Sequence, residues 1–275
     1  MTLRVVHHGP LTRILLTARV AGRPVYRVSA YALGDTLVDS GCAKTAPELL
    51  AWARAHGIRR VVHTHHHEDH VGGDGLLASR LGVEILAPAR AVPILDRYYR
   101  LPLYRRIVWG QPRNVASRPL GATVRIGELE FRVIRTPGHS WDHVCFFCPA
   151  NRWLFSGDLF IAERVQYLRP VEDAHLHLDS LRRVADLDPA LLVCSHAGVV
   201  EDARGALRRR IAHREELARR AEELRRRGLS PRRITRRLLG REGFMTVLSA
   251  GNFSKANLVR SLLKPRGCAT VPPGG

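Results

Sequence analysis

Short apolar runs alternate with amphipathic stretches along the first part of the chain. The apolar runs Tyr26–Leu33 and Thr36–Val38 flank the turn pair Gly34-Asp35, which predicts a β-hairpin. The stretch Thr45–His56 then has the periodicity of a helix, and the β-branched run Ile58–His63 predicts a short buried strand. Strands that alternate with helices are typical of a layered α/β fold.

The middle of the chain is rich in apolar runs of strand length. We expect strands over Thr123–Ile126, Leu129–Arg135, Val144–Cys148, Trp153–Ser156 and Leu191–Cys194, and a helix over Leu176–Leu187. Residues 88–120 have no clear period and contain several Tyr and Pro. This segment is either a lid or substrate wall, or a packed pair of surface helices.

The chain after Asp202 is expected to be helical up to Leu263, with a loose end over Pro265–Gly275. An Arg- and Glu-rich stretch comes first, and Ser230-Pro231 has the cap-then-proline order that starts another helix. Asn252 is expected to cap a last helix over Phe253–Leu263.

Length and charge suggest how the chain is divided. The chain has 275 residues and a net charge of +19. This length fits one large α/β domain with an appendage, so we divide it into residues 1–204 and a small C-terminal domain, residues 205–275. Residues 201–275 contain 19 basic and seven acidic side chains. Such a basic region is either a solvated Arg-rich face or a surface that attracts an anionic partner such as RNA.

The strongest chemical signal is the run His65-His66-His67-Glu68-Asp69-His70, directly after a predicted buried strand. In an extended chain His65 and His67 project to the same side, so both can reach one metal ion. Asp69 and His70 lie in the following turn and can serve a second metal ion. Imidazole and carboxylate ligands together suit zinc, with iron and manganese as alternatives.

Three more side chains of ligand type stand at the ends of predicted strands. His139 follows a Thr-Pro-Gly turn, Asp158 follows a Ser-Gly pair, and His196 follows a Cys-Ser pair. One isolated histidine of this kind is more often a core or surface residue. Four strand ends that all deliver His or Asp are hard to explain in that way, so we expect one metal centre built from distant segments.

Together these segments resemble the ordered motifs of the metallo-β-lactamase superfamily, over residues 25–200 or so of the chain. The resemblance implies a four-layered αββα sandwich with the metal ions at one edge, followed here by a winged-helix-like C-terminal domain. It also implies the ligands of two divalent metal ions: His65, His67 and His139 for the first, Asp69, His70 and His196 for the second, and Asp158 as a bridge between them.

The resemblance implies catalytic roles for two aspartates. Val38-Asp39-Ser40-Gly41 is similar to the superfamily's first motif, so Asp39 is expected to support the site from outside the ligand set. Alternatively, Asp39 only caps the turn into the next helix. Two cations about 3.5–4 Å apart would lower the pKa of a shared water and give a bridging hydroxide near neutral pH. Asp69 is a candidate to orient that nucleophile.

Departures from known branches narrow the function. Asp158 stands where one β-lactamase class has Cys, and His67 stands where flavodiiron proteins have Glu, which disfavours β-lactam and redox chemistry. Thr136–His143 is similar to a glyoxalase II segment, but Ser195-His196-Ala197-Gly198 replaces that branch's Gly-His-Glu-Tyr signature. Gly198–Arg214 is similar to the β-lactamase-like protein 2 branch, in which some members act on single-stranded RNA.

Three functional hypotheses follow from these observations. The first is a binuclear hydrolase that acts on a small ester, thioester or lactone, with an anionic substrate as one option. The second is a phosphodiesterase or endoribonuclease that uses the same metals and contacts nucleic acid through its basic C-terminal domain. The third is a non-catalytic nucleic-acid-binding protein with a structural metal. A structural zinc closes its shell with four ligands, so seven candidate ligands argue against the third.

Other cysteines and histidines are expected to have no part in metal binding. Cys145 and Cys148 lie three residues apart in a predicted strand, so they should point to opposite faces and pack in the core. His143 is expected in the core or against the ligands, and His175 and His177 at the surface or rim. Since no segment has the pattern of a signal peptide or a membrane span, we expect a cytoplasmic protein without a membrane partner.

Overall fold

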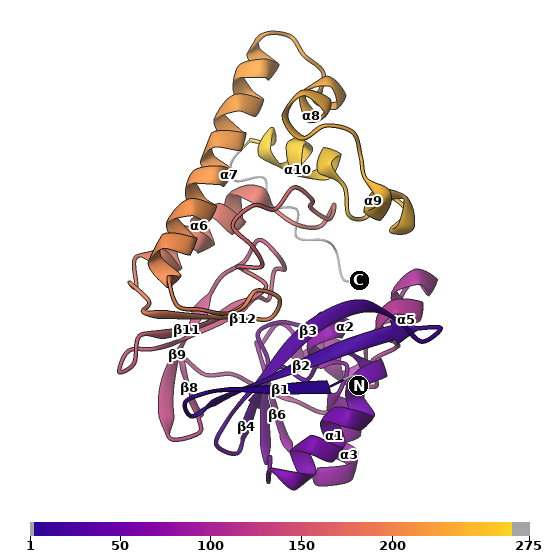
Figure 1. Ribbon diagram of the computed structural model, residues 1–275, viewed down its shortest axis with the longest axis vertical. Coiled ribbons are helices and arrows are strands. Elements are labelled where there is room, and N and C mark those ends of the chain that lie inside the picture. Colours follow the sequence, from indigo (N-terminus) through magenta and orange to yellow (C-terminus); the bar gives the residue numbers. More distant parts are fainter. Residues whose placement is uncertain (1–2, 266–275) are drawn as a thin grey trace.

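Two β-sheets packed face to face form the centre of the computed structural model, which describes residues 3–265 (Figure 1). The first sheet contains, in spatial order, β1 (Leu3–His8), β2 (Leu11–Val20), β3 (Arg23–Leu33), β4 (Thr36–Val38), β5 (Arg60–Val62), β6 (Glu84–Ala87) and β7 (Arg118–Pro119). The second contains β13 (Gly198–Val200), β12 (Leu191–Cys194), β11 (Trp153–Gly157), β10 (Val144–Cys148), β9 (Leu129–Arg135) and β8 (Thr123–Ile126).

Helices cover the outer faces of both sheets, which gives the predicted four-layered sandwich. After the short turn η1 (Ala43–Thr45), α1 (Ala46–Ala55) packs beside α3 (Asp74–Leu81) on the first sheet. On the second sheet lie α6 (Ala174–Ala185) and the beginning of α7 (Ala203–Arg226). Aromatic side chains fill the space between the sheets, among them Phe131, Phe146 and Phe155. Burial of this apolar surface is the main term that stabilises the sandwich.

Cys145 and Cys148 lie on opposite faces of the strand β10, as their spacing predicts. Cys148 packs in the cluster between the two sheets, whereas Cys145 packs in the cluster under α6 and α7. Both thiols are buried and free. Their positions on opposite faces of β10 exclude a shared metal, as the spacing predicts.

The irregular segment 88–120 contains two short helices, α4 (Val92–Asp96) and α5 (Leu103–Trp109). Leu95, Tyr98 and Leu101 pack into the core cluster of the first sheet. The hydroxyl of Tyr98 donates a hydrogen bond of 2.8 Å to the carbonyl oxygen of His66. The segment is therefore both packed and part of the wall beside the predicted ligand loop.

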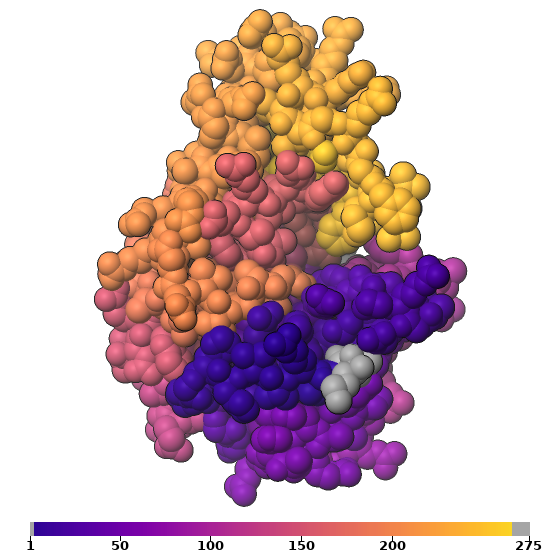
Figure 2. Space-filling model, viewed as in Figure 1, coloured from indigo at the N-terminus to yellow at the C-terminus, as the bar shows by residue number. Residues whose placement is uncertain are grey.

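The C-terminal region consists of α7 and three shorter helices, α8 (Pro231–Leu239), α9 (Phe244–Leu248) and α10 (Lys255–Leu262). In Figure 2 the orange and yellow residues of these helices form one mass at the top of the view. The cap expected at Asn252 was wrong, because the side chain of Ser254 accepts the capping bond from the backbone N–H of Asn257. Among residues 3–265, no helix is long and apolar enough to cross a membrane.

Candidate metal centre

Four of the seven predicted ligands lie in one tight loop after β5. This loop carries His65 and His67 and then turns into the short helix α2 (Glu68–Val71), which carries Asp69 and His70. Gly72 lets the loop pack closely, since a Cβ there would lie only 2.2 Å from the backbone nitrogen of Ala43. All four side chains are buried, so the loop directs polar groups into the interior instead of toward water.

The other three ligands follow strands of the second sheet. His139 comes after β9, Asp158 directly follows β11, and His196 lies two residues beyond β12. Because β11 and β12 are parallel neighbours, Asp158 and His196 lie at the same edge of the sheet. Gly157 before Asp158 has a φ of +49°, and a Cβ there would lie 2.8 Å from His143 Nε2. Only glycine fits this turn without strain.

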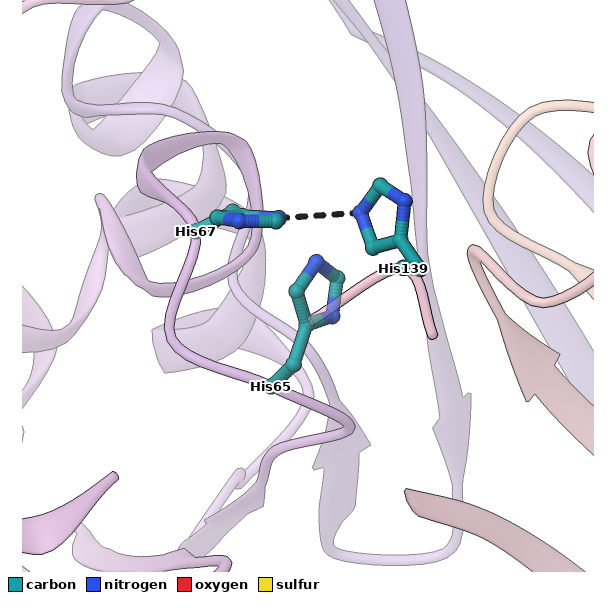
Figure 3. Close-up of side chains that lie close together, drawn as sticks. All are labelled: His65, His67 and His139. Carbon is teal, nitrogen blue, oxygen red and sulfur yellow. Dashed lines mark hydrogen bonds between the residues drawn. The ribbon is translucent and has the colours of Figure 1, made fainter. Parts of the chain in front are cut away.

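His65, His67 and His139 form the first ligand group, with one ligand atom of each within 4.8 Å of the others. Figure 3 shows the rings pointing toward one another, and His67 Nδ1 lies 2.9 Å from His139 Nε2. Burial holds the pKa of all three imidazoles well below its usual range, and Arg169 lowers that of His67 further. Three neutral imidazoles therefore face one point at neutral pH.

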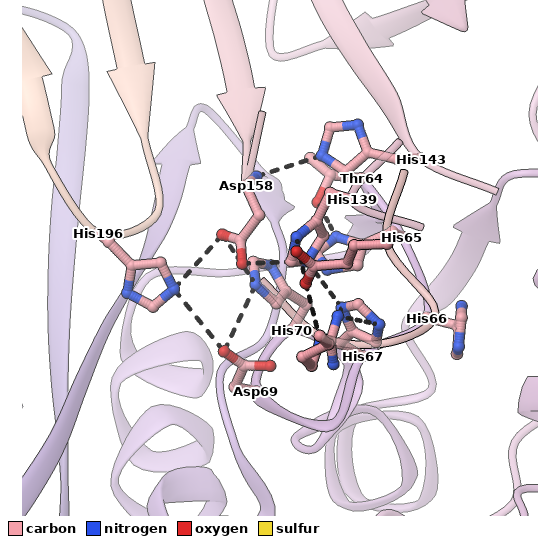
Figure 4. Close-up of polar contacts among 12 residues, drawn as sticks. Thr64, His65, His66, His67, Asp69, His70, His139, His143, Asp158 and His196 are labelled. Atoms are coloured by element: carbon pink, nitrogen blue, oxygen red, sulfur yellow. Dashed lines mark hydrogen bonds and ion pairs between the residues drawn. The ribbon is translucent and has the colours of Figure 1, made fainter. Parts of the chain in front are cut away.

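Asp69, His70, Asp158 and His196 form the second ligand group, also within 4.8 Å of one another (Figure 4). Asp158 Oδ1 lies 3.3 Å from His70 Nε2 and 3.4 Å from His196 Nε2. Burial is the largest single influence and would lower the pKa of both histidines, but the carboxylates of Asp158 and Asp69 together raise the pKa of each. Burial would raise the pKa of Asp158, but His196 and His70 together lower it well below its usual range.

Asp158 stands between the two groups. Its Oδ1 faces the second group, while its Oδ2 lies 3.4 Å from His139 Nε2 of the first group. One carboxylate with its two oxygens turned toward two sets of donors has the placement expected of a bridge between two metal ions.

Asp39 supports the second group from outside the ligand set. Its carboxylate accepts hydrogen bonds from His70 Nδ1 (2.7 Å) and from the backbone N–H of Thr64 (2.9 Å). The bond to Nδ1 fixes the ring of His70 so that Nε2 faces Asp158. Asp39 has a φ of +60°, a strained conformation that the surrounding hydrogen bonds hold in place. Asp39 thus orients the ring of a candidate ligand, and neither of these two contacts caps a helix.

The residues present fit a pair of divalent metal ions. His65 Nε2, His70 Nε2 and Asp158 Oδ1 are buried and have no hydrogen-bond partner among residues 3–265. Buried polar atoms without partners are costly unless another group satisfies them. A cation at each group would do so, and a mixed imidazole and carboxylate donor set suits zinc.

Three residues beside the ligands had no signal in the sequence. The hydroxyl of Tyr26 donates to Asp69 Oδ2 at 2.7 Å. Arg169 Nη2 lies 2.9 Å from His67 Nε2, and Arg169 Nε donates to Glu172 Oε1 at 2.8 Å. Tyr26 comes from the β2–β3 hairpin and the other two from a loop after β11, and neither segment contains a recognisable motif.

Two other buried histidines, His63 and His143, have structural partners. His63 lies between two carboxylates, 2.8 Å from Asp74 Oδ2 and 3.5 Å from Asp39 Oδ1. His143 Nε2 accepts from the backbone N–H of Asp158 at 3.2 Å, so it supports the ligand set as expected. The prediction of a surface or rim position for His177 was wrong, because it lies on the buried face of α6 with 5% of its surface exposed.

Known proteins are similar to this chain in sequence. The hydroxyacylglutathione hydrolase of Rhodospirillum rubrum is 32% identical over 177 residues, which make up 62% of this chain and 61% of that protein. The atrochrysone carboxyl ACP thioesterase of Aspergillus fumigatus is 30% identical over 183 residues, 65% of this chain and 52% of that protein. The chain thus spans between half and two thirds of the length of these curated relatives.

Solved structures and a family model extend the similarity. A metallo-beta-lactamase family protein from Thermus thermophilus superposes with a TM-score of 0.63 at 20% identity, over 92% of this chain and 91% of that one. Residues 24–196, more than half of the chain, match the family model described as the metallo-beta-lactamase superfamily. This range contains all seven candidate ligands, and the chain belongs to the metallo-beta-lactamase superfamily.

Proposed function

We propose that the protein is a hydrolase that uses two divalent metal ions, zinc by preference, to cleave an ester or thioester of a small substrate. The observation that carries the proposal is the convergence of seven ligand-type side chains into two adjacent groups with Asp158 between them. A purely structural metal would need one closed set of four ligands, so this arrangement disfavours the non-catalytic hypothesis.

Each side chain has a defined task in this proposal. His65, His67 and His139 hold one ion, Asp69, His70 and His196 hold the other, and Asp158 contacts both. When bound, the two ions supply a hydroxide near neutral pH and stabilise the negative charge that develops on the substrate oxygen. Asp69, which accepts a hydrogen bond from Tyr26, is placed to orient the attacking water.

The relatives favour a thioester over a β-lactam. The names of the Rhodospirillum rubrum and Aspergillus fumigatus proteins describe hydrolysis of an acylglutathione and of an acyl carrier protein thioester. Neither name mentions β-lactams. Because Ser195-His196-Ala197-Gly198 departs from the glyoxalase II signature, we do not extend the glutathione part of the first name to this chain.

A second candidate is a phosphodiesterase or endoribonuclease. The observation that favours it is a cavity of about 480 Å³ in the C-terminal region, lined by Arg232, Arg236, Arg241 and Arg260. Four guanidinium groups around one cavity suit a phosphate group, and RNA is the polymer that would present several of them.

Parallel assays separate the two candidates. We expect the metal-loaded protein to hydrolyse an acyl-N-acetylcysteamine thioester and to leave bis(p-nitrophenyl) phosphate intact, with His67→Ala abolishing the thioester activity. Turnover of the phosphodiester, together with RNA binding that falls steeply with salt and is lost in an Arg232→Gln/Arg236→Gln variant, would instead support the nuclease. If neither substrate reacts with the loaded protein, both candidates fail.

A further inference from the structure

The buried face of α7 carries two arginines where its pattern calls for apolar side chains. The first half of the helix packs on the second sheet through residues such as Ala206 and Leu207. Its second half packs against the other C-terminal helices through residues such as Leu217 and Ala221. Arg210 and Arg214 lie between these two stretches, one helical turn apart. Only 2% of the surface of Arg210 and none of that of Arg214 is exposed.

Neither guanidinium has a partner among the residues that the structure describes. Nε and Nη1 of Arg210 and all three nitrogens of Arg214 are buried without a hydrogen bond, and no carboxylate oxygen of the described chain lies within 4.0 Å of either group. A third buried group, Nδ1 of His177 on α6, is also without a partner among residues 3–265. Burial and the charges of Arg210 and Arg214 hold the pKa of His177 well below its usual range, so a neutral imidazole lies within the electrostatic reach of both arginines.

The nearest acid cannot compensate for both arginines. Glu172 is close enough for its charge to act on Arg210 and Arg214, but its Oε1 already accepts from Arg169 and lies 3.4 Å from His139 Nδ1. The single carboxylate of Glu172 is thus the nearest negative charge to three guanidinium groups, those of Arg169, Arg210 and Arg214. Burial lowers the pKa of Arg214 to about 10, so its charge remains at neutral pH, and burial together with the charge of Arg214 lowers the pKa of Arg210 well below its usual range. Buried charges without a counter-ion are strongly unfavourable, which indicates a missing anion.

We propose that Arg210, Arg214 and the Nδ1 of His177 bind a small oxyanion of the phosphate or sulfate class, buried between α6 and α7. Planar guanidinium forks match the oxygens of such an ion with pairs of hydrogen bonds. The near-complete burial of both arginines excludes a large organic anion. The site differs from the seven metal ligands and from the arginine cavity between α8 and α10, and Glu172 connects it to the metal centre.

Thermal unfolding at constant ionic strength tests the proposal. The melting temperature is measured in phosphate and, as a control, in gluconate, an anion too large to enter the site between α6 and α7. The Arg214→Met variant is compared with Arg220→Met, which removes an exposed arginine from the same helix. We expect the melting temperature of the wild type and of Arg220→Met to rise by several degrees and to saturate with phosphate. Arg214→Met should not respond, and in gluconate it should be at least as stable as the wild type, because a buried unpaired charge has been removed.

Several outcomes would refute the proposed anion site. These are a wild-type protein that does not respond to phosphate or sulfate, an Arg214→Met variant that responds as the wild type does, and an equal response to chloride. If Arg214→Met does not fold, crystals of the wild type soaked in selenate decide the question. An anomalous selenium peak within hydrogen-bond distance of Arg210 and Arg214 is the expected result, and its absence refutes the proposal.

Discussion

The two candidate ligand groups bury similar side chains, but neighbouring charges shift the pKa values of their histidines in opposite directions. The first group contains three imidazoles whose pKa values lie well below the usual range, so each has a free lone pair at neutral pH. In the second group the carboxylates of Asp69 and Asp158 raise the pKa of His70 and His196. The first group is therefore ready to accept a cation, whereas the second must release protons when one binds. Neighbouring charges, more than residue type, set this difference.

Removal of the residue that joins the two groups should have the largest effect. Asp158→Asn keeps the shape but removes the charge that faces both groups. We expect the rate of thioester hydrolysis to fall by at least about 10²–10³-fold, because weaker binding of the ions would remove groups that stabilise the developing oxyanion. Steady-state kinetics measures the rate, metal analysis measures the bound metal, and His67→Ala is the variant with which Asp158→Asn is compared. If Asp158→Asn loses less activity than His67→Ala, Asp158 is not a bridge.

Loss of the support from Asp39 should affect the second group selectively. Asp39→Asn removes the charged acceptor of His70 Nδ1, and we expect metal affinity or activity to fall by about 10–100-fold. The surface substitution Glu128→Gln serves as the matched control and should change neither quantity. A competitive chelator titration measures the affinities. A variant that loses the metal of the first group instead would contradict the assignment of Asp39.

The difference in pKa predicts a difference in pH dependence. Because the pKa of His70 and His196 is raised, protons compete with the metal at the second group as the pH falls toward and below their pKa. The affinity of this group should fall by about tenfold per pH unit for each proton displaced. The histidines of the first group titrate below their usual range, so its affinity should stay nearly constant from about pH 6 to pH 8.

Single-group variants make this measurement possible. Zinc titrations of His196→Ala report the first group, and titrations of His139→Ala report the second. Equal pH slopes in the two variants would show that the groups are not prepared differently.

Loss of the Tyr26 hydroxyl should have the smallest effect. Tyr26→Phe removes a donor to Asp69 while both metal groups keep all their ligands. One net hydrogen bond is worth about 1 kcal/mol, so we expect a fall of about three- to tenfold in kcat. Metal content should be unchanged. A variant with fewer metals would give Tyr26 a part in holding the second group.

The candidate ligands could be found in the sequence because their signals are local. Each ligand follows an apolar run of strand length, and the run from His65 to His70 is itself a compact motif. Parallel strands end at the same edge of a sheet, so residues that follow such strands in the sequence lie close together in space. Five of the predicted strands, β4, β8, β9, β10 and β12, have the predicted bounds.

Contacts made by distant loops could not be predicted in this way. Glu172 and Arg169 reach the metal centre from a loop whose path depends on packing against the C-terminal helices. His177 opens a helix in the sequence, and only the position of α7 shows that it is buried. Strand β2 was not predicted although Ile14, Leu16 and Ala18 are buried, because the half-buried Leu15 is also apolar and the sequence therefore does not alternate. Tertiary packing decides each of these features.

Anomalous diffraction at the zinc edge, from crystals of the zinc-loaded protein, tests the central claim most directly. Two peaks about 3.5–4 Å apart are expected. One should lie among His65, His67 and His139, and the other among Asp69, His70 and His196, with Asp158 in contact with both. A single peak, or two peaks away from these side chains, would contradict the account of a two-metal centre.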